Sequence, residues 1–203
     1  IARSRDKMRC LQLLAQSGIS IPKTVMAAVG SSVKSLIEEV GGLPCIIKLL
    51  RGTQGVGVMI ANTVTEAQTI LQTFWGLDQD VCLQEFIRES EGRDVRALII
   101  GDRIIAAMRR QAREGEFRSN IHRGGTGAPL QLESAYEAAA VKAAKVIGLG
   151  ICGVDMLEGQ NGPIVIELNS SPGFEGLERT TNIDIAAKMA EFALSLVKER
   201  KAT

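Results

Sequence analysis

The sequence has few aromatic residues, almost no net charge and no long apolar run. Aromatic side chains make up 3% of the 203 residues, so a core has to be built mostly from aliphatic side chains. The net charge of +1 argues against a nucleic-acid-binding protein and against an acidic tail. An apolar run of roughly 18 residues, the length that a membrane-spanning helix needs, is absent. We therefore expect neither a nucleic acid nor a membrane as a partner.

The sequence also has a single histidine and does not begin with methionine. His122 is the only histidine, and no Gly-x-Ser-x-Gly elbow occurs, which argues against hydrolytic triads. A surface or structural role for His122 is a simpler interpretation than substrate contact. Because the chain begins at Ile1, we expect a piece of a longer protein whose other part carries a further domain or a signal.

The cysteines show no C-x-x-C pair, and three of them lie inside apolar runs. A disulfide or zinc role is the alternative, but this placement favours reduced thiols in a core, which is typical of a cytoplasmic protein. The four positions are Cys10, Cys45, Cys82 and Cys152.

Apolar periodicity and turn residues predict alternating helices and largely antiparallel strands, which indicates an α+β fold. Hairpins are expected around Gly101-Asp102 and around residues 159–162, and residues 111–129 are polar, glycine-rich and irregular. A division between two lobes is expected near Ile87–Glu91. The predicted helices are 2–17, 31–42, 63–75, 132–147 and 183–200, and the other predicted strands are 24–29, 45–50, 57–62 and 81–87.

The segment KLLRGTQGVGV, residues 48–58, places three glycines between two strands, with Lys48 on the first strand. Glycine allows backbone N–H groups to approach a phosphate, and a nearby lysine adds positive charge. The segment is not a Walker loop, because Val58 stands where that motif requires lysine, and it is not a dinucleotide fingerprint, because Ile60 occupies the third glycine position. A glycine-rich hairpin turn with an exposed lysine is the alternative. The glycines are Gly52, Gly55 and Gly57.

The second hairpin ends in IELNSSPG and predicts a metal site. If its turn centres on Asn161, Asp155 lies opposite Glu167, and Asn169 shares their face because side chains alternate along a strand. Two close carboxylates repel each other, and an all-oxygen set with few protein ligands suits magnesium. Ile166 and Leu168 would then point the other way. Two solvated carboxylates on an exposed sheet face are the alternative.

Residues 102–123 carry six arginines against three carboxylates. Arginine forks bind phosphates and carboxylates, so this segment is a candidate substrate region. A solvated basic loop or a nucleic-acid contact are the alternatives, although Phe117 is the only aromatic nearby and offers no stacking platform.

The combined motifs resemble the RimK-type glutamate ligases of the ATP-grasp superfamily. The resemblance covers nearly the whole chain, although members of this family carry a further N-terminal domain before the SRDK helix. It rests on the segments SRDKMRCLQLLAQSGI, KLLRGTQGVGV, QEFIRESEGRDVRALIIG, EGEFRSNIHRGG, CGVDML and ELNSSPGFEGLE.

The resemblance implies an α+β ATP-grasp fold with two lobes, residues 1–87 and 88–203, whose mostly antiparallel sheets hold ATP between them. It implies two magnesium ions, with Glu167 shared and manganese as a possible substitute. The implied metal ligands are Asp155, Glu167 and Asn169. The implied ATP contacts are Lys7 and Lys48 at phosphates, the glycine loop, Glu85, Phe86 and Ile87 at adenine, Asp94 near the ribose, and Arg118, Ser119 and Asn120 at the phosphate end. Arg110, Arg118 and Asn120 are the expected catalytic residues.

The implied reaction joins L-glutamate to the C-terminus of a small-subunit ribosomal protein through an acyl phosphate, in the cytoplasm, by a homo-oligomer of the full-length protein. A ligase that acts on a cofactor or on an amino-group carrier protein is the nearest alternative, and a nucleotide-binding module without catalysis is another. The SNIHRGG and SPGFEG segments favour the protein-modifying type, because substrate contacts are expected there.

Overall fold

The structure is a computed structural model that describes residues 1–50, 57–90, 92–121 and 124–202. Its contacts group the chain into two compact units. Residues Ile21–Arg88 form one of them, called the small unit below. Residues Ile1–Ser20 and Glu89–Thr203 together form the large unit.

The small unit contains, in its described part, a four-stranded antiparallel sheet in the order β1-β4-β2-β3. Two helices pack on the sheet through an aliphatic core that includes Leu36, Ile47, Leu71 and Leu83. Thr63 caps the second helix by accepting a hydrogen bond from the Glu66 N–H. The elements are β1 (Thr24–Met26), α3 (Val33–Glu39), β2 (Cys45–Leu49), β3 (Val58–Ala61), α4 (Val64–Gly76) and β4 (Val81–Glu85).

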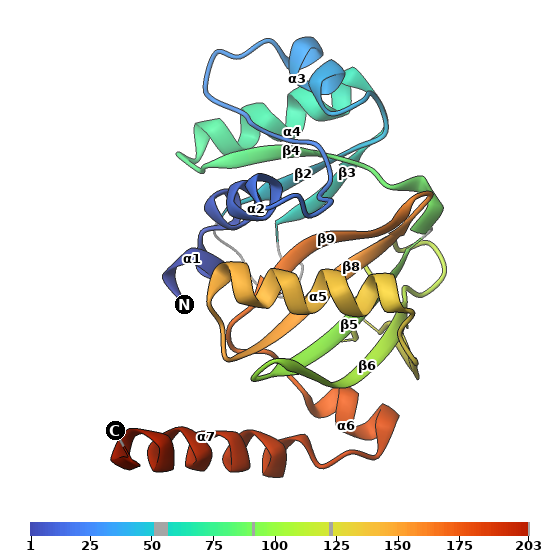
Figure 1. Cartoon of the computed structure of the whole chain (residues 1–203). Coiled ribbons are helices and arrows are strands. Elements are labelled where there is room, and N and C mark those ends of the chain that lie inside the picture. The colour runs from blue at the N-terminus through green and yellow to red at the C-terminus, as the bar shows by residue number, and fades with distance from the viewer. Residues whose placement is uncertain (51–56, 91, 122–123, 203) are drawn as a thin grey trace. The chain divides into compact units, whose positions relative to one another are not determined.

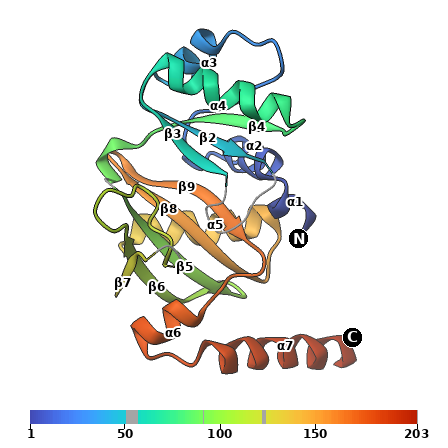
Figure 2. The same ribbon diagram turned by 180° about the vertical axis from the view of Figure 1, so that it is seen from behind.

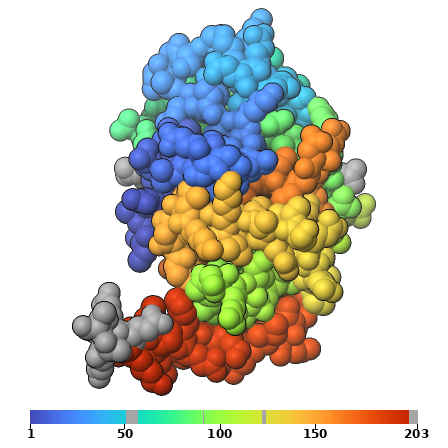
Figure 3. All heavy atoms as spheres, viewed as in Figure 1, coloured from blue at the N-terminus to red at the C-terminus, as the bar shows by residue number. Residues whose placement is uncertain are grey.

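The large unit contains, among its described residues, a five-stranded antiparallel sheet in the order β7-β6-β5-β8-β9. Helix α5 crosses one face of this sheet (Figure 1), and α2 lies beside α5, as the adjoining surfaces in Figure 3 show. The elements are α1 (Ala2–Arg5), α2 (Lys7–Gln16), a 3-10 turn (Arg88–Ser90), β5 (Arg93–Ile100), β6 (Arg103–Gln111), β7 (Thr126–Pro129), α5 (Ser134–Ile147), β8 (Ile151–Gly159), β9 (Gly162–Asn169), α6 (Glu175–Thr181) and α7 (Ile185–Ala202).

The sheet face opposite α5, seen in Figure 2, has an apolar part and a polar part. Leu98, Ala106 and Met108 of β5 and β6 pack against Leu177 of α6 and Ile185 of α7. Further along the same strands, charged side chains replace these apolar ones. The apolar part holds α6 in place, and the polar part contains most of the candidate site.

Several predicted elements differ from the observed ones. The expected helix 2–17 is two helices, because Asp6 interrupts it and caps α2 by accepting from the Arg9 N–H. Residues 126–129 of the expected irregular segment form β7, and α6 was not anticipated. Helix α7 is less amphipathic than expected, since Leu194 and Val197 are 62% and 52% exposed.

The lead-in helices also belong to a different unit from the one expected. The sequence places residues 1–20 with the first lobe, but α2 contacts α5 and β9 of the large unit. The Ser20 carbonyl accepts a 2.8 Å hydrogen bond from the Val165 N–H of β9. This long-range pairing has no signature in the local sequence.

Two expectations from composition can be compared with the described residues. All four cysteines lie in that part of the chain, and each is buried and belongs to no disulfide, as predicted. No helix in the described ranges is both long enough and apolar enough to cross a membrane.

Candidate active site

The β8–β9 hairpin brings Asp155 and Glu167 together. The two residues are cross-strand partners, and Asn169 pairs with Gly153 two positions further along, so the predicted register is confirmed. The turn consists of Gln160-Asn161, which by itself would set Asp155 opposite Ile166. A bulge between Asp155 and Met156 adds one residue to β9 and restores the pairing.

The bulge also affects the residues of β9 that were expected to point away from the metal ligands. Val165 and Leu168 are both buried although they are three residues apart, which a regular strand would not allow on one face. Ile166 is half-buried and is the extra residue of the bulge, between the pairs Met156–Val165 and Asp155–Glu167. The bulge thus interrupts the regular alternation from which Ile166 and Leu168 were expected to point the same way.

Two arginines on the neighbouring strands bind the Asp155 carboxylate. Arg96 of β5 donates from Nε to Oδ1 at 2.7 Å and from Nη2 to Oδ2 at 2.6 Å. Arg110 of β6 approaches Oδ2 with its Nη2 at 3.1 Å, and the Asn169 Nδ2 lies 3.4 Å from the same oxygen. Asp155 is 3% exposed, so its charge is shielded from water. The two arginines compensate this buried charge with charge-assisted hydrogen bonds, and Arg96 does so in a bidentate arrangement.

Arg110 extends the network to Asp94. Its Nε and Nη2 donate to the two carboxylate oxygens of Asp94 at 2.6 and 2.5 Å, and the Ser119 hydroxyl also bonds that carboxylate. Asp94 and Arg110 are 4% and 3% exposed. Two residues predicted to touch substrate are thus bonded to each other, and their predicted roles at the ribose and at the acyl phosphate stay predictions.

The two carboxyl groups that Arg110 binds have pKa values shifted in opposite directions. Burial opposes ionisation of Asp155, but Arg110 and Arg96 together hold its pKa below the usual range. Burial raises the pKa of Asp94, against the opposing effects of Arg110 and of the Ser119 hydroxyl. Burial also disfavours the charged form of Arg110, but the two carboxylates outweigh this effect and raise the pKa of Arg110 above its usual value. Asp155 therefore carries its negative charge without any bound metal.

Helix α2 packs beside the end of β9 that carries Glu167. Burial and the nearby Glu167 carboxylate raise the pKa of the Cys10 thiol to about 11, and this thiol contacts the Leu168 backbone. Lys7 begins α2 and lies three residues before Cys10, hence on a neighbouring part of the same helix face. The fold thus places α2, which begins with the predicted phosphate contact Lys7, against β9, the strand that carries the predicted metal ligands Glu167 and Asn169.

The loop after β6 contains the remaining predicted residues of the large unit. Arg118 donates to both carboxylate oxygens of Glu116, from Nε at 3.0 Å and from Nη2 at 2.7 Å. This contact lowers the pKa of Glu116 to about 2. The half-buried Asn120 lies next to Ser119, and its carbonyl accepts from the Gly125 N–H. His122 lies outside the described residues.

Four arginines in the described part of this basic segment form ion pairs with carboxylates. Arg109 binds Glu158 at 2.6 Å, while Arg110 and Arg118 bind the carboxylates described above. Arg103 lies 3.8 Å from Asp102 at an exposed position. An acidic ligand would therefore compete with carboxylates of the protein itself.

The small unit fixes Lys48 through a chain of hydrogen bonds. The Lys48 Nζ donates to Gln84 Oε1 at 2.5 Å, and the buried Gln84 donates from Nε2 to the Thr24 hydroxyl at 2.8 Å. Glu85 is bonded to Lys23 through both its backbone N–H and its carboxylate. Of the predicted adenine contacts, Phe86 is half-buried and Ile87 is 7% exposed.

Gly57 ends the glycine loop next to β3, whereas Gly52 and Gly55 lie outside the described residues. Its φ of +73° is a left-handed value that side chains rarely adopt, and a Cβ there would lie 2.6 Å from Leu49 Cδ1. The glycine at this position is therefore required by geometry. Its predicted phosphate contact is not tested by the structure.

A family model described as the RimK-like ATP-grasp domain matches residues 4–193. The chain belongs to this family. Its similar curated relatives include the probable alpha-L-glutamate ligases of Saccharophagus degradans and Vibrio atlanticus, which are 52% and 51% identical over 192 residues. These alignments cover 95% of this chain and 64% of each relative, so the chain spans less than two thirds of their length.

Solved structures show the same fold. The ATP-grasp ligase PsnB, complexed with a phosphomimetic precursor variant, Mg and ADP, is 27% identical with a TM-score of 0.76, over 96% of this chain and 58% of that one. The D-alanine–D-alanine ligase from Bacillus anthracis, complexed with ATP, is 18% identical with a TM-score of 0.74, over 97% and 68%. The expected α+β ATP-grasp fold is thereby confirmed.

The donor atoms of this RimK-like domain fit magnesium. Among the described residues, no three His, Cys, Asp or Glu side chains form a metal cluster, so a site here depends on the Asn169 amide as well as on two carboxylates. Each carboxylate oxygen has two lone pairs, and Oδ1 of Asp155 accepts only from Arg96 within the described contacts. An all-oxygen donor set with this open position suits magnesium.

Sequence reasoning missed two residues of the site, Arg96 and Gln84. Arg96 stands two positions from Asp94 in an apolar strand, so the period of two places both on one face. An arginine at such a position was the available signal. Gln84 precedes the predicted adenine segment, and only the pairing of β2 with β4 shows that it reaches Lys48.

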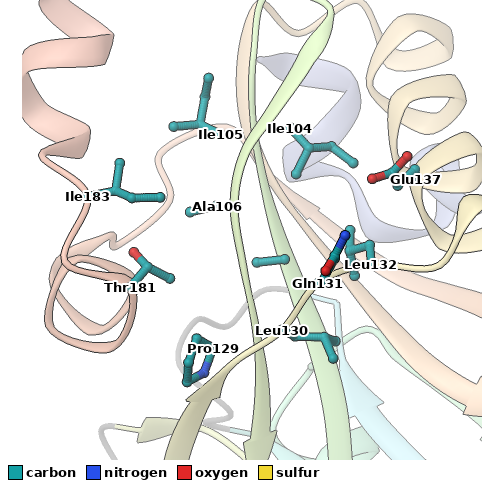
Figure 4. Close-up of a pocket in the computed structure, with 11 residues that line it drawn as sticks. Ile104, Ile105, Ala106, Pro129, Leu130, Gln131, Leu132, Glu137, Thr181 and Ile183 are labelled. Atoms are coloured by element: carbon teal, nitrogen blue, oxygen red, sulfur yellow. The ribbon is translucent and has the colours of Figure 1, made fainter.

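An apolar groove of about 390 Å³ lies beside β6 in the large unit (Figure 4). Figure 4 shows Thr181 and Ile183 on one side of β6 and Glu137 of α5 on the other. Its described lining contains none of the predicted site residues. The lining residues are Ile104, Ile105, Ala106, Ala107, Pro129, Leu130, Gln131, Leu132, Glu137, Thr181 and Ile183.

Proposed function

We propose that this RimK-like domain serves an ATP-dependent carboxylate–amine ligase that adds L-glutamate to the C-terminus of a small-subunit ribosomal protein. The observation that carries this proposal is the cross-strand pair of Asp155 and Glu167, with Asn169 on the same face. The glutamate-ligase names of the curated relatives support the same chemistry. The identity of the acceptor rests on the resemblance of the sequence motifs alone.

The proposed reaction has two steps. A carboxylate oxygen of the acceptor attacks the γ-phosphorus of ATP, and ADP leaves with the electrons of the broken P–O bond. The amine nitrogen of L-glutamate then attacks the acyl carbon, phosphate leaves with the electrons of the C–O bond, and the nitrogen loses a proton. No covalent bond to the protein is formed, so its contribution is positioning and charge neutralisation.

The proposal assigns the phosphate contacts to several charged or polar side chains. Lys48, oriented by Gln84, and Lys7 at the start of α2 donate to phosphate oxygens. Arg110 keeps its Nη1 group outside its contacts with the two aspartates, and that group donates to the acyl phosphate. Arg118 and Asn120 contact the same phosphoryl group.

Asp155, Glu167 and Asn169 are proposed to hold two magnesium ions, with Glu167 shared between them and manganese as a possible substitute. When bound, these ions supply charge neutralisation and polarisation at the transferred phosphoryl group. The residues Glu85, Phe86 and Ile87 are proposed as the adenine contacts. A cytoplasmic location and a homo-oligomer of the full-length protein complete the proposal.

The proposal predicts a large effect of Glu167→Gln. Removing one ligand charge should lower the rate of magnesium-dependent ADP release by on the order of a hundredfold or more, with glutamate and acceptor present. The matched control is Glu158→Gln on the same hairpin, whose carboxylate binds Arg109 instead. ADP release at the normal rate by Glu167→Gln would show that the metal assignment is wrong.

Labelled glutamate distinguishes the related functions. The proposed ligase incorporates the label into a protein acceptor only when ATP is present. Incorporation into a cofactor or an amino-group carrier protein would identify a ligase with another acceptor. ATP binding by the full-length protein without any ADP release would identify a nucleotide-binding module instead.

A further inference from the structure

Arg96 lies on the central strand of the large sheet and binds the predicted metal ligand Asp155. Strand β5 runs between β6 and β8, and Arg96 is the cross-strand partner of Asp155. Its side chain is 15% exposed, compared with 5% for that of Asp155. Two short, parallel hydrogen bonds of 2.7 and 2.6 Å join the two side chains. This fork fixes the plane of the carboxylate as well as its position.

Strand β8 passes close to Arg96 at Gly153. A Cβ added at Gly153 would lie 3.9 Å from the Nε of Arg96 and 3.1 Å from Pro172. Gly153 stands two residues before Asp155, hence on the same sheet face. A Cβ at this position would be in ordinary contact with Arg96 and in tight contact with Pro172, so Gly153 lies between the fork and the Ser-Ser-Pro-Gly break after β9.

The contacts distribute unevenly over the two oxygens of Asp155. Oδ2 receives Arg96, Arg110 and the more distant Asn169 amide, whereas Oδ1 receives Arg96 alone among the described contacts. Because each oxygen has two lone pairs, Oδ1 keeps one position for a further partner. The orientation that Arg96 imposes decides which oxygen offers that position.

We propose that Arg96 is a positioning residue that orients Asp155 so that Oδ1 is presented to the divalent metal. This inference rests on the proposed function, because it concerns the same metal site. Outer partners that hold a metal ligand in place typically change metal affinity by about 10- to 100-fold when they are removed. The positive charge of Arg96 acts in the opposite direction, since a nearby cation repels a metal ion.

Because orientation and charge repulsion act in opposite directions, the change in metal affinity of the Arg96 variants shows which of the two effects is larger. If orientation dominates, loss of the fork weakens metal binding even when the charge is kept, as in Arg96→Lys. A lysine provides a point charge without a planar fork. If repulsion dominates, Arg96→Gln binds the metal more tightly than the wild-type protein, and Arg96→Lys resembles the wild type.

The test measures Mn²⁺ affinity by electron paramagnetic resonance, in the full-length protein with saturating ADP. The variants are Arg96→Lys and Arg96→Gln, and the matched control is Arg109→Lys. Arg109 also contacts a carboxylate of β8 with Nε and Nη2, but its partner Glu158 lies outside the predicted metal set. Circular dichroism verifies the fold, and Arg96→Lys decides the test if Arg96→Gln does not fold.

We expect Mn²⁺ binding to weaken about tenfold or more in both Arg96 variants, with less than about a twofold change in Arg109→Lys. In the ligase assay, the magnesium concentration for half-maximal rate should rise by a similar factor, while the rate at saturating magnesium changes little. Unchanged or tighter Mn²⁺ binding by Arg96→Lys would overturn the inference. Absence of Mn²⁺ binding by the wild-type protein would instead contradict the proposed function, and with it this inference.

Discussion

At the scale of single residues, arginines determine the charge of the candidate site. Asp155 is neutralised by Arg96 and Arg110, so repulsion between Asp155 and Glu167 is not what favours a metal here. The case for magnesium depends instead on the type of donor atoms and on the lone pair of Oδ1. A metal site of this kind can be folded before the metal arrives, because the buried charges are already paired.

The Glu116–Arg118 pair predicts a measurable pH dependence. The pKa of Glu116 is lowered from 4.5 to about 2, mainly by the Arg118 side chain. Its ionised form therefore stabilises the fold above pH 4.5, and this contribution is lost as the pH falls from 4.5 towards 2. We expect Glu116→Gln to lose less stability across that window than the wild-type protein.

Urea unfolding midpoints, measured above pH 4.5 and again between pH 2 and 4.5, test this prediction. Glu114→Gln is the control, because Glu114 is an exposed carboxylate on the same loop. An acid-induced loss of stability in Glu116→Gln that equals the wild-type loss would contradict the assignment.

At the scale of elements, local patterns predicted the hairpins but not their irregularities. The predicted turn at Gly101-Asp102 follows from short-range chemistry and is observed. The bulge next to Asp155 is invisible in the alternation of residues, yet it is what makes the predicted pair meet. The hypothesis reached the correct register because the assumed turn centre and the bulge have the same effect.

Elements that depend on distant partners were missed for a physical reason. Strand β7 has the sequence TGAP and is exposed along its whole length, so no apolar alternation marks it. It forms because it pairs with the edge of β6. Arg96 was missed in the same way, since its role appears only when β5 and β8 are neighbours.

The stem of the glycine loop gives a prediction at this scale. Gly57→Ala combines a left-handed φ with a 2.6 Å approach to Leu49, whereas Gly30→Ala has a similar φ of +84° and nothing within 4 Å. We expect Gly30→Ala to cost about 1–2 kcal/mol of stability. Gly57→Ala should cost clearly more, because the β2–β3 ladder must also shift.

Thermal unfolding midpoints of the two variants separate the effect of φ from that of the steric contact. Adding Gly57→Ala to a Leu49→Ala background should cost less than adding it to the wild-type protein. Leu49→Ala removes the Cδ1 and Cγ atoms that lie 2.6 and 2.8 Å from the new Cβ, although the Leu49 Cβ at 2.9 Å stays. Equal midpoints for Gly57→Ala and Gly30→Ala would contradict the role of the Leu49 contact.

At the scale of the whole molecule, the sequence indicated two lobes, and the contacts show two units with different membership. The difference is residues 1–20, which pack with β9 and α5 in the large unit. Lys7 consequently belongs with the predicted metal ligands and not with Lys48. A helix that starts the chain gives no local sign of which sheet it will pack against.

The chain belongs to the RimK-like family, and the central proposal concerns the reaction and the acceptor of the full-length protein. The most direct test is mass spectrometry of ribosomal proteins incubated with the full-length protein, ATP, magnesium and L-glutamate. We expect one small-subunit protein to gain mass in steps of one glutamate residue, only when ATP is present and not with Glu167→Gln. The proposed function would be contradicted if ADP were released while no ribosomal protein gained the mass of a glutamate residue. An equal mass gain with Glu167→Gln would contradict it as well.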